Sequence, residues 1–122
     1  MKKKKILLVD DEPAFTRAVK VNLQSRYNIR IENQGSRVFD AVRDFGPDLI
    51  LMDIMMPDMD GCEAARKLRD SFSFRNTPIV FVTALVTRNE TADKKTKVND
   101  YPCIAKPATP EDLMACIEAN LQ

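Results

Sequence analysis

The chain contains no histidine. This absence excludes a Ser-His-Asp triad, a Cys-His pair and a histidine-ligated metal centre. Any chemistry must therefore use carboxylates, hydroxyls, lysine or thiols. The thiols are few, since there are three cysteines, an odd number, and none of them forms a C-x-x-C pair. Neither a disulfide framework nor a zinc site is indicated.

Long apolar runs are also missing. The basic start of the chain is followed by only four apolar residues, at positions 6–9. A secretory signal needs roughly 7–15 apolar residues, and a membrane-spanning helix needs about 20. We therefore expect a cytoplasmic protein without membrane association. The lysines at positions 2–5 are interpreted as a solvated lead-in to the first strand rather than as a site for phosphate or acidic lipid. The net charge of +1 gives no general attraction to nucleic acid, so direct nucleic-acid binding is not expected.

What the sequence does contain is an alternation of strand-like and helix-like segments. Its 122 residues, 44% of them hydrophobic, suit a single domain over residues 1–122. Short apolar runs predict strands at 6–9, 29–31, 49–52, 79–82 and 103–105. Helical periodicity predicts helices near 15–23 and 38–45, from just after Gly61 to 68, and after an N-cap at Thr109. The order indicates an α/β fold with a parallel sheet covered on both faces.

The segment between the last two predicted strands is different. Residues 87–100 are mostly polar or charged. Helical stability in proteins comes mainly from a packed apolar face, which this segment barely has. The fourth helix is therefore expected to be short, frayed or mobile.

Polar side chains follow the predicted strands where function usually gathers in such sheets, at their carboxyl ends. Asp10-Asp11-Glu12 follows the first strand and Asp53 follows the third. Two carboxylates about 4 Å apart repel by about 4 kcal/mol at an effective dielectric near 20. Convergence of these acids would therefore raise their pKa values or favour binding of a hard cation. Oxygen ligands with room for water suit Mg²⁺.

Two further groups extend this pattern. Thr83 follows the fourth strand and supplies a hydroxyl, and Lys106 follows the fifth and supplies a positive charge. A cation, an ammonium and a hydroxyl together form a pocket for a tetrahedral dianion. A carboxylate beside it could act as a nucleophile and form an acyl phosphate.

With these residues in place, the sequence resembles the receiver domains of bacterial response regulators along nearly its whole length. The similarity is carried by residues 6–13, 53–61, 83–84 and 106–107, in both order and spacing. The resemblance implies a flavodoxin-like (βα)5 three-layer sandwich with a five-stranded parallel sheet of order 2-1-3-4-5. It also implies a phosphorylation-activated signalling switch rather than an enzyme, catalysing only its own phosphorylation and dephosphorylation.

The resemblance assigns a metal site. Asp11 and Asp53 look like direct Mg²⁺ ligands, Asp10 like a ligand through water, and the Met55 backbone carbonyl like the remaining protein ligand. The same likeness allows Mn²⁺ in place of Mg²⁺.

The resemblance also assigns the phosphoryl chemistry. Asp53 looks like the phosphoacceptor, Thr83 like the hydroxyl that moves toward the phosphoryl group, and Lys106 like its ion-pair partner. The donor would be a phosphohistidine of a sensor histidine kinase or a histidine phosphotransfer protein. The signal would leave through the fourth helix, fifth strand and fifth helix, to a downstream protein or to an output domain absent from this chain. Family members often have a cis bond before the proline that matches Pro107.

Three features of the sequence depart from the family pattern. Cys103 stands where receivers usually carry the Tyr or Phe that switches rotamer, Asn99-Asp100 stands in place of the usual Gly-Ala, and Ala108 replaces a common aromatic. Tyr101 lies two residues before Cys103, so a local change of register could let it take the switch role. We hypothesise that activation orders or shifts residues 87–100 more than it turns a ring.

Other interpretations of these residues remain open at this point. The acids at 10–12 could cap the first helix, Asp53 could simply end a strand, Thr83 could be a turn residue, and Lys106 could be a surface lysine. At the level of function, the chain could be a phosphorylation-independent interaction module. It could also be a small phosphatase with an aspartyl nucleophile, although Met55 stands where that chemistry generally wants an acid/base carboxylate.

Overall fold

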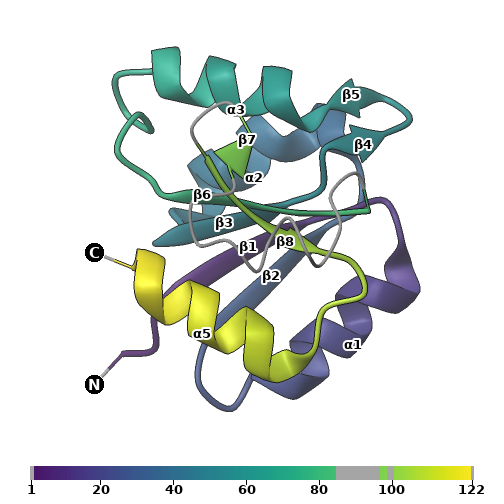
Figure 1. Cartoon of the computed structure of the whole chain (residues 1–122). Coiled ribbons are helices and arrows are strands. Elements are labelled where there is room, and N and C mark those ends of the chain that lie inside the picture. Colours follow the sequence, from purple (N-terminus) through teal and green to yellow (C-terminus); the bar gives the residue numbers. More distant parts are fainter. Residues whose placement is uncertain (1, 85–96, 99–100, 122) are drawn as a thin grey trace.

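A parallel β-sheet forms the centre of the structure (Figure 1). The structure is a computed structural model that describes residues 2–84, 97–98 and 101–121. The strands that run parallel within the described residues are ordered β2-β1-β3-β6-β8. In sequence terms this is the order 2-1-3-4-5, so the expected fold class is confirmed. The strands of the sheet are β1 (Lys5–Val9), β2 (Asn28–Glu32), β3 (Leu49–Met52), β6 (Ile79–Thr83), β7 (Lys97–Val98) and β8 (Tyr101–Ala105).

Helices cover both faces of this sheet (Figure 1). They are α1 (Pro13–Leu23), α2 (Val38–Phe45), α3 (Gly61–Asp70) and α5 (Pro110–Asn120), with a short 3-10 helix, η1 (Gly35–Arg37), leading into α2. The helices α1 and α5 lie on one face, and α2 and α3 lie on the other. None of the helices in the described part of the chain is both long and apolar enough to span a membrane.

Two cores result because side chains along each strand alternate between the two faces. One face carries Leu7, Val9, Ile50, Met52 and Phe81 towards α2 and α3. The other carries its alternate neighbours towards α1 and α5, among them Ile6, Leu8, Leu49, Leu51, Val80 and Val82. Burial on both faces explains why the central strands are continuous apolar runs.

Two short antiparallel pairings were not anticipated. β7 pairs with the beginning of β8, which starts at Tyr101, two residues before the expected strand. A hairpin of β4 (Met55–Met56) and β5 (Met59–Asp60) fills the segment between Asp53 and α3. Strands of two residues are too short to show a periodicity, so the sequence gives no sign of them.

The expected helix boundaries are largely confirmed. Thr109 caps α5, since its Oγ1 accepts a hydrogen bond from the Asp112 N–H at 3.0 Å while the Asp112 carboxylate accepts from the Thr109 N–H. Gly46 ends α2 in the left-handed conformation, with φ of 63°. α3 begins at Gly61, one residue earlier than expected, with Asp60 as its N-cap.

The prediction of a short, frayed or mobile fourth helix concerns residues outside the described part of the chain. The hypothesis that activation orders or shifts residues 87–100 concerns a segment of which only residues 97–98 are described.

The β4–β5 hairpin is fastened to the start of η1 by one side chain. The Asp58 carboxylate accepts hydrogen bonds from the N–H groups of Gly35 and Ser36, at 3.1 and 3.0 Å. Hydrogen bonds from Ser36, first from its backbone N–H and then from its side chain, and lastly from the Gly35 N–H hold the pKa of Asp58 below its ordinary value. Gly35 is needed for this approach, because a Cβ there would lie 2.9 Å from the Cβ of Met59. The hairpin and η1 therefore fit together only with glycine at this position.

The start of α3 is packed just as closely against the residues that follow β3. The N–H of Gly61 donates to the carbonyl oxygen of Ile54 at 2.7 Å. A Cβ on Gly61 would overlap the Asp53 carbonyl oxygen and lie 2.8 Å from the Ile54 Cα. Because backbone atoms cannot move aside as a flexible side chain can, position 61 admits no side chain without displacing the Asp53 backbone.

We predict that Asp58→Asn lowers the thermal stability at pH 7, because an amide can neither carry the charge nor accept well from both N–H groups. The charged carboxylate, with its lowered pKa, contributes stability above about pH 4, and this is lost as the pH falls through the folded-state pKa. The difference in Tm between variant and wild type should therefore shrink below about pH 4. Asp70→Asn, at an exposed acid of α3, is the control. Equal Tm values for Asp58→Asn and wild type at pH 7 would show that the contact of Asp58 with the start of η1 does not stabilise the fold.

We predict that Gly61→Ala destabilises the fold by about 2 kcal/mol, as overpacking against backbone atoms does. Urea unfolding measures this. Gly46→Ala is a useful comparison, because no atom of the described residues lies within 4 Å of the place that its methyl group would take, and only the left-handed φ of 63° opposes alanine. That strain costs about 1 kcal/mol. A Gly61→Ala protein as stable as the wild type would show that the contact relaxes at little cost.

Candidate functional site

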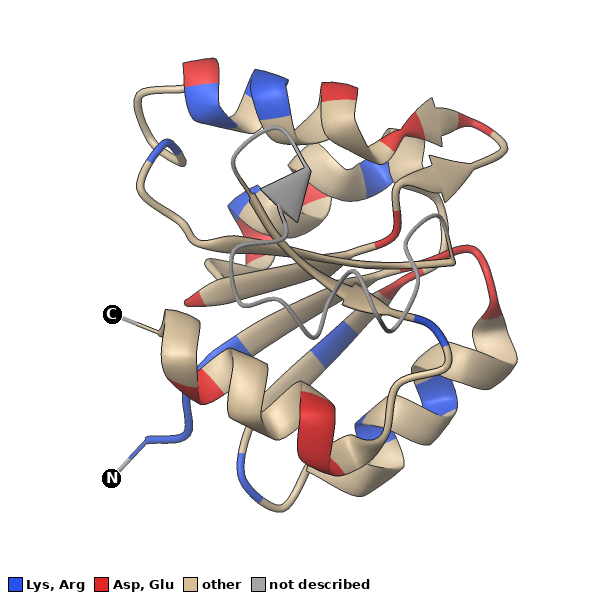
Figure 2. Cartoon of the chain, in the orientation of Figure 1, with Lys and Arg blue, Asp and Glu red and all other residues tan. Residues whose placement is uncertain are grey.

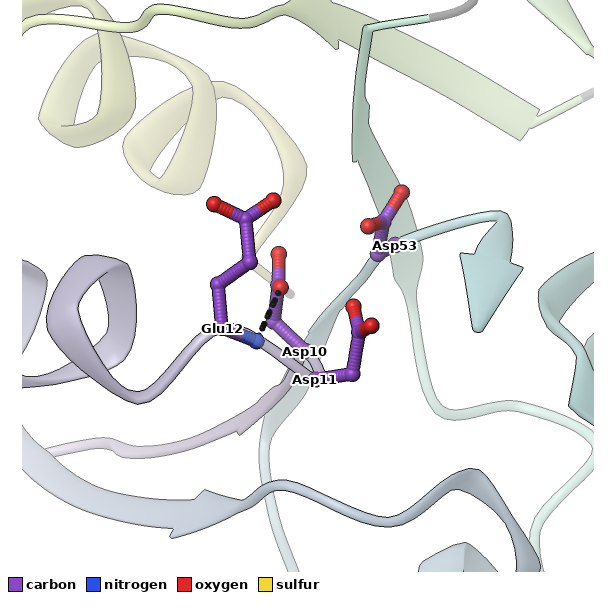
Figure 3. A group of neighbouring side chains, drawn as sticks. All are labelled: Asp10, Asp11, Glu12 and Asp53. Atoms are coloured by element: carbon purple, nitrogen blue, oxygen red, sulfur yellow. Dashed lines mark hydrogen bonds between the residues drawn. The ribbon is translucent and has the colours of Figure 1, made fainter. Parts of the chain in front are cut away.

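Four carboxylates meet where β1 and β3 end. One side-chain oxygen from each of Asp10, Asp11, Glu12 and Asp53 lies within 4.8 Å of the others (Figure 3). The strand register causes this meeting: Val9 pairs with Met52, so the residues after both strands leave the sheet side by side. Figure 2 shows acidic segments gathered at this rim of the sheet. The structure therefore brings together the acids that the sequence placed at the strand ends.

Asp10 is the most deeply buried of these acids, with a relative exposure of 1%. Its Oδ1 accepts a hydrogen bond from the Glu12 N–H at 3.0 Å. Its Oδ2 accepts no hydrogen bond of good geometry from the described residues, although it lies 2.7 Å from the Lys106 Nζ. Burial raises the pKa of Asp10, and Lys106 and the Glu12 N–H oppose this only in part. A buried oxygen with so few partners is suited to a cation or to an ordered water.

Lys106 supplies positive charge to this cluster. Its side chain is 12% exposed, and its Nζ lies 2.7 Å from Asp10, 3.1 Å from Glu12 and 3.3 Å from Asp53. Burial disfavours the ammonium, but these carboxylates outweigh it and raise the pKa of Lys106 above its ordinary value. Lys106 therefore stays charged and points inward, so its interpretation as a surface lysine is wrong. The Lys106-Pro107 bond is cis, in agreement with the resemblance.

Asp53 is held in place from both sides. Its Oδ1 accepts from the Met55 N–H at 3.3 Å, and its Oδ2 accepts from the Lys106 ammonium at 3.3 Å. Its own N–H donates to the Val9 carbonyl oxygen, which ties it to the end of β1. At 6% exposure its carboxylate is close to the surface without being freely solvated. Asp53 thus does more than end a strand.

A hollow of about 530 Å³ opens beside the acids. It is lined by Asp11, Ile54, Met55, Met56, Pro57 and Asp60. The donors at the rim are all oxygen atoms, and the Lys106 ammonium is paired with three of the four carboxylates, leaving an excess of negative charge. Oxygen donors, excess negative charge and room for water are the conditions that Mg²⁺ prefers. The residues present therefore fit a hydrated divalent cation.

Thr83 lies at the same rim, as the last residue of β6. It is 1% exposed, and its carbonyl oxygen accepts a hydrogen bond from the Lys106 N–H at 3.0 Å. Thr83 pairs with Ala105, so the ends of β6 and β8 lie next to each other. A buried strand residue is not a turn residue, and that interpretation of Thr83 is wrong.

Cys103 and Tyr101 occupy regular positions on β8. Cys103 pairs with Phe81, and the change of register that would bring Tyr101 to the position of Cys103 is not observed. The Tyr101 ring is buried, packs edge-to-face against Phe81 at 5.5 Å, and lies 4.7 Å from the Arg69 guanidinium. Tyr101 is therefore positioned away from the carboxyl end of the strand.

Sequence reasoning missed two side chains next to Lys106. Glu12 was assigned no role of its own, yet it pairs with Lys106. It is the N-cap of α1 but makes no side-chain capping hydrogen bond. Its carboxylate pairs with Lys106 instead of capping the helix. The Phe15 ring centroid lies 4.6 Å from the Lys106 Nζ. Phe15 begins the helix predicted near 15–23, and no local pattern connects it to the far end of the chain.

The chain is similar to known proteins over nearly its whole length. The family model of the response regulator receiver domain matches residues 6–118. The transcriptional regulatory protein TrcR of Mycobacterium tuberculosis is 35% identical over 123 residues, covering 97% of this chain and 45% of that protein. The uncharacterized transcriptional regulatory protein YkoG of Bacillus subtilis is 35% identical over 127 residues, covering 100% of this chain and 53% of that protein. The chain spans about half the length of the curated relatives it matches.

Solved structures show the same similarity over nearly the whole chain. The chemotaxis protein CheY4 of Vibrio cholerae has a TM-score of 0.83 at 26% identity, with 98% of this chain and 99% of that chain covered. The receiver domain of the sensor histidine kinase PA1611 of Pseudomonas aeruginosa has a TM-score of 0.79 at 26% identity, with 96% of each chain covered, and was solved with a magnesium ion coordinated in its active-site cleft. With a family match over residues 6–118 and a shared fold, this chain belongs to the response regulator receiver domain family.

Proposed function

We propose that this chain is a phosphorylation-activated signalling switch that accepts a phosphoryl group on Asp53. One observation carries the proposal: the Asp53 carboxylate lies 3.3 Å from the Lys106 ammonium within a group of acids that suits a divalent cation. A nucleophilic carboxylate flanked by positive charge is the arrangement that forms an acyl phosphate.

The transfer exchanges one bond to phosphorus for another. An Asp53 oxygen forms the new P–O bond while the N–P bond of a donor phosphohistidine breaks. The departing imidazole nitrogen keeps the electron pair of the broken bond and takes up a proton. Lys106, already paired with the Asp53 Oδ2, follows the negative charge onto the phosphoryl oxygens. The Thr83 hydroxyl, from the neighbouring strand end, moves toward the same group.

A metal completes the charge balance in this proposal. Asp11 and Asp53 would hold Mg²⁺ or Mn²⁺ directly, Asp10 would hold it through water, and the Met55 carbonyl would supply a further oxygen. When bound, the ion supplies positive charge that offsets the charge of the phosphoryl oxygens. The chain's own residues orient the nucleophile, through the Met55 N–H on the Asp53 Oδ1.

The partners follow from the chemistry and from the relatives. The donor is a sensor histidine kinase or a histidine phosphotransfer protein, and we expect the exchange in the cytoplasm. TrcR is a transcriptional regulatory protein and MtrA a DNA-binding response regulator, and this chain matches about half of each. The recipient of the signal is therefore an output domain or a separate protein that contacts β8, α5 and the segment between β6 and β8 for which the sequence predicts the fourth helix.

The two other functions considered for the sequence are less well supported. A phosphorylation-independent module has no use for an inward-pointing Lys106 beside Asp53, both largely buried. An aspartyl phosphatase needs an acid/base group two residues after the nucleophile. Met55 stands there, and its thioether is 64% exposed and cannot transfer a proton. We infer a domain that catalyses only its own phosphorylation and dephosphorylation.

The phosphoacceptor assignment is tested by incubating the protein with phosphoramidate and Mg²⁺ and measuring the intact mass. We expect one phosphoryl adduct on the wild type and none on Asp53→Asn, which keeps the shape of the side chain but not its nucleophilicity. Asp44→Asn changes an exposed acid on α2 and should be phosphorylated like the wild type. An adduct on Asp53→Asn of the same yield would contradict the assignment.

The metal assignment is tested by thermal unfolding with and without Mg²⁺. The wild type should gain roughly 1.4 kcal/mol at an ion concentration ten times Kd. Asp11→Asn should be more stable than the wild type without Mg²⁺, because it relieves carboxylate repulsion, and it should gain little when Mg²⁺ is added. Glu12→Gln, which alters an acid paired with Lys106 instead, should keep the Mg²⁺ response. The assignment fails if Asp11→Asn responds to Mg²⁺ as strongly as the wild type.

A further inference from the structure

The Lys106 ammonium lies between two kinds of surface. Three carboxylates, those of Asp10, Glu12 and Asp53, lie within 3.3 Å of its Nζ. The Phe15 ring also lies against it, with its centroid 4.6 Å away. Phe15 is half-buried in the first turn of α1, directly after the loop that carries the acids. The position of the ammonium is therefore set by an aromatic ring as well as by ion pairs.

The carboxylates around Lys106 are not equivalent. Asp10 and Asp53 have side-chain exposures of 1% and 8%, whereas Glu12 is 62% exposed. A shift of the ammonium towards Glu12 would take it towards solvent and away from Asp53. The negative face of an aromatic ring attracts a cation, and more strongly when the cation is partly desolvated, as Lys106 is at 12% exposure. The half-buried ring and the exposed Glu12 carboxylate therefore both act on the same ammonium.

We propose that Phe15 is a positioning residue for phosphoryl transfer, whose ring keeps the Lys106 ammonium beside Asp53 and out of the reach of solvent. Glu12 is its competitor, an exposed acid that draws the same ammonium outward. The inference rests on the proposed function, because it gives Lys106 the task of meeting the phosphoryl group. Weakening the ring should slow phosphorylation, and neutralising Glu12 should offset that loss.

The packing around Phe15 shows how a purely structural role can be separated from this one. A small cavity of about 80 Å³ lies next to the ring, between α1 and α5, and its lining includes Phe15, Val19, Ala108 and Leu113. Truncation to leucine would enlarge this cavity and so disturb packing as well as electrostatics. Fluorination of the ring leaves its size almost unchanged and removes the negative charge from its face. The second change isolates the interaction with the cation.

The experiment replaces Phe15 with trifluorophenylalanine by site-specific incorporation and measures phosphorylation of Asp53 over a range of phosphoramidate and Mg²⁺ concentrations. We expect the rate constant to fall about two- to fivefold, with the apparent Mg²⁺ affinity and the Tm unchanged. Phe72 provides a matched control, because it is 85% exposed and its ring also lies near a cation, Arg75, at 5.2 Å. The same replacement at Phe72 should leave the rate unchanged. Glu12→Gln should restore part of the rate lost at Phe15.

A second measurement does not depend on activity. A ring beside the Lys106 ammonium should shift the NMR signals of the adjacent ε-methylene to high field, and Phe15→Leu should abolish this shift. Ordinary ε-methylene shifts in the wild type would overturn the proposal. An unchanged phosphorylation rate of the fluorinated protein would also overturn the proposal. If Phe15→Leu were nevertheless phosphorylated slowly, the packing of the side chain alone would account for that loss. Failure of the proposed function itself would look different, because the wild type would then acquire no phosphoryl group on Asp53.

Discussion

Crowding of negative charge at one rim of the sheet is the constraint on which the rest of this structure depends. Four carboxylates share a space of less than 5 Å, and one of them, Asp10, is buried with an oxygen that lacks a well-oriented donor among the described residues. Such a group is stable only next to positive charge. Lys106 provides part of that charge from the far end of the chain. Its ion pairs therefore connect the first, third and last strands of the parallel sheet electrostatically as well as through the backbone.

The backbone around the cluster fixes where that charge sits. Asp53 follows β3 without a spacer, and its N–H is bonded to Val9. The next turn of chain cannot relax outward, because Gly61 packs directly against the Asp53 and Ile54 backbone. Asp58 fastens the β4–β5 hairpin to the N–H groups that open η1. Asp53 and Met55, the proposed phosphoacceptor and one of the proposed metal ligands, thus belong to a segment held at both ends, which is what a site that must place charge accurately requires.

How far the sequence predicts this arrangement depends on the range of each interaction. The alternating apolar runs predict the strand order once the family is recognised, and the acids at the strand ends predict the cluster, because the carboxyl ends of parallel strands share a rim. Thr109 and Gly46 predict their helix ends through local capping chemistry. The contact of Phe15 with Lys106 and the hydrogen bonds of Asp58 with Gly35 and Ser36 could not be predicted in this way. Each joins segments that are far apart in the sequence, and no local pattern indicates it. A two-residue pairing such as β4 with β5 leaves no pattern that could reveal it.

Cys103, on the last strand, is one of the positions at which this chain departs from the pattern expected of receivers, and it bears on how a signal can leave the site. β8 ends at Ala105, and the Lys106 N–H that follows is bonded to the Thr83 carbonyl, so β6 and β8 move together at the rim. Cys103, between the rim and Tyr101, has no aromatic ring, so it cannot transmit a change by the ring rotation expected of receivers. Tyr101 is already enclosed by Phe81 and Arg69. In the proposed function, charge added at Asp53 reaches β8 through the Lys106 ammonium, which is paired with Asp53 and directly follows that strand. Phe15 and Glu12 both contact this ammonium, so its position is the variable on which the proposed role of Phe15 depends.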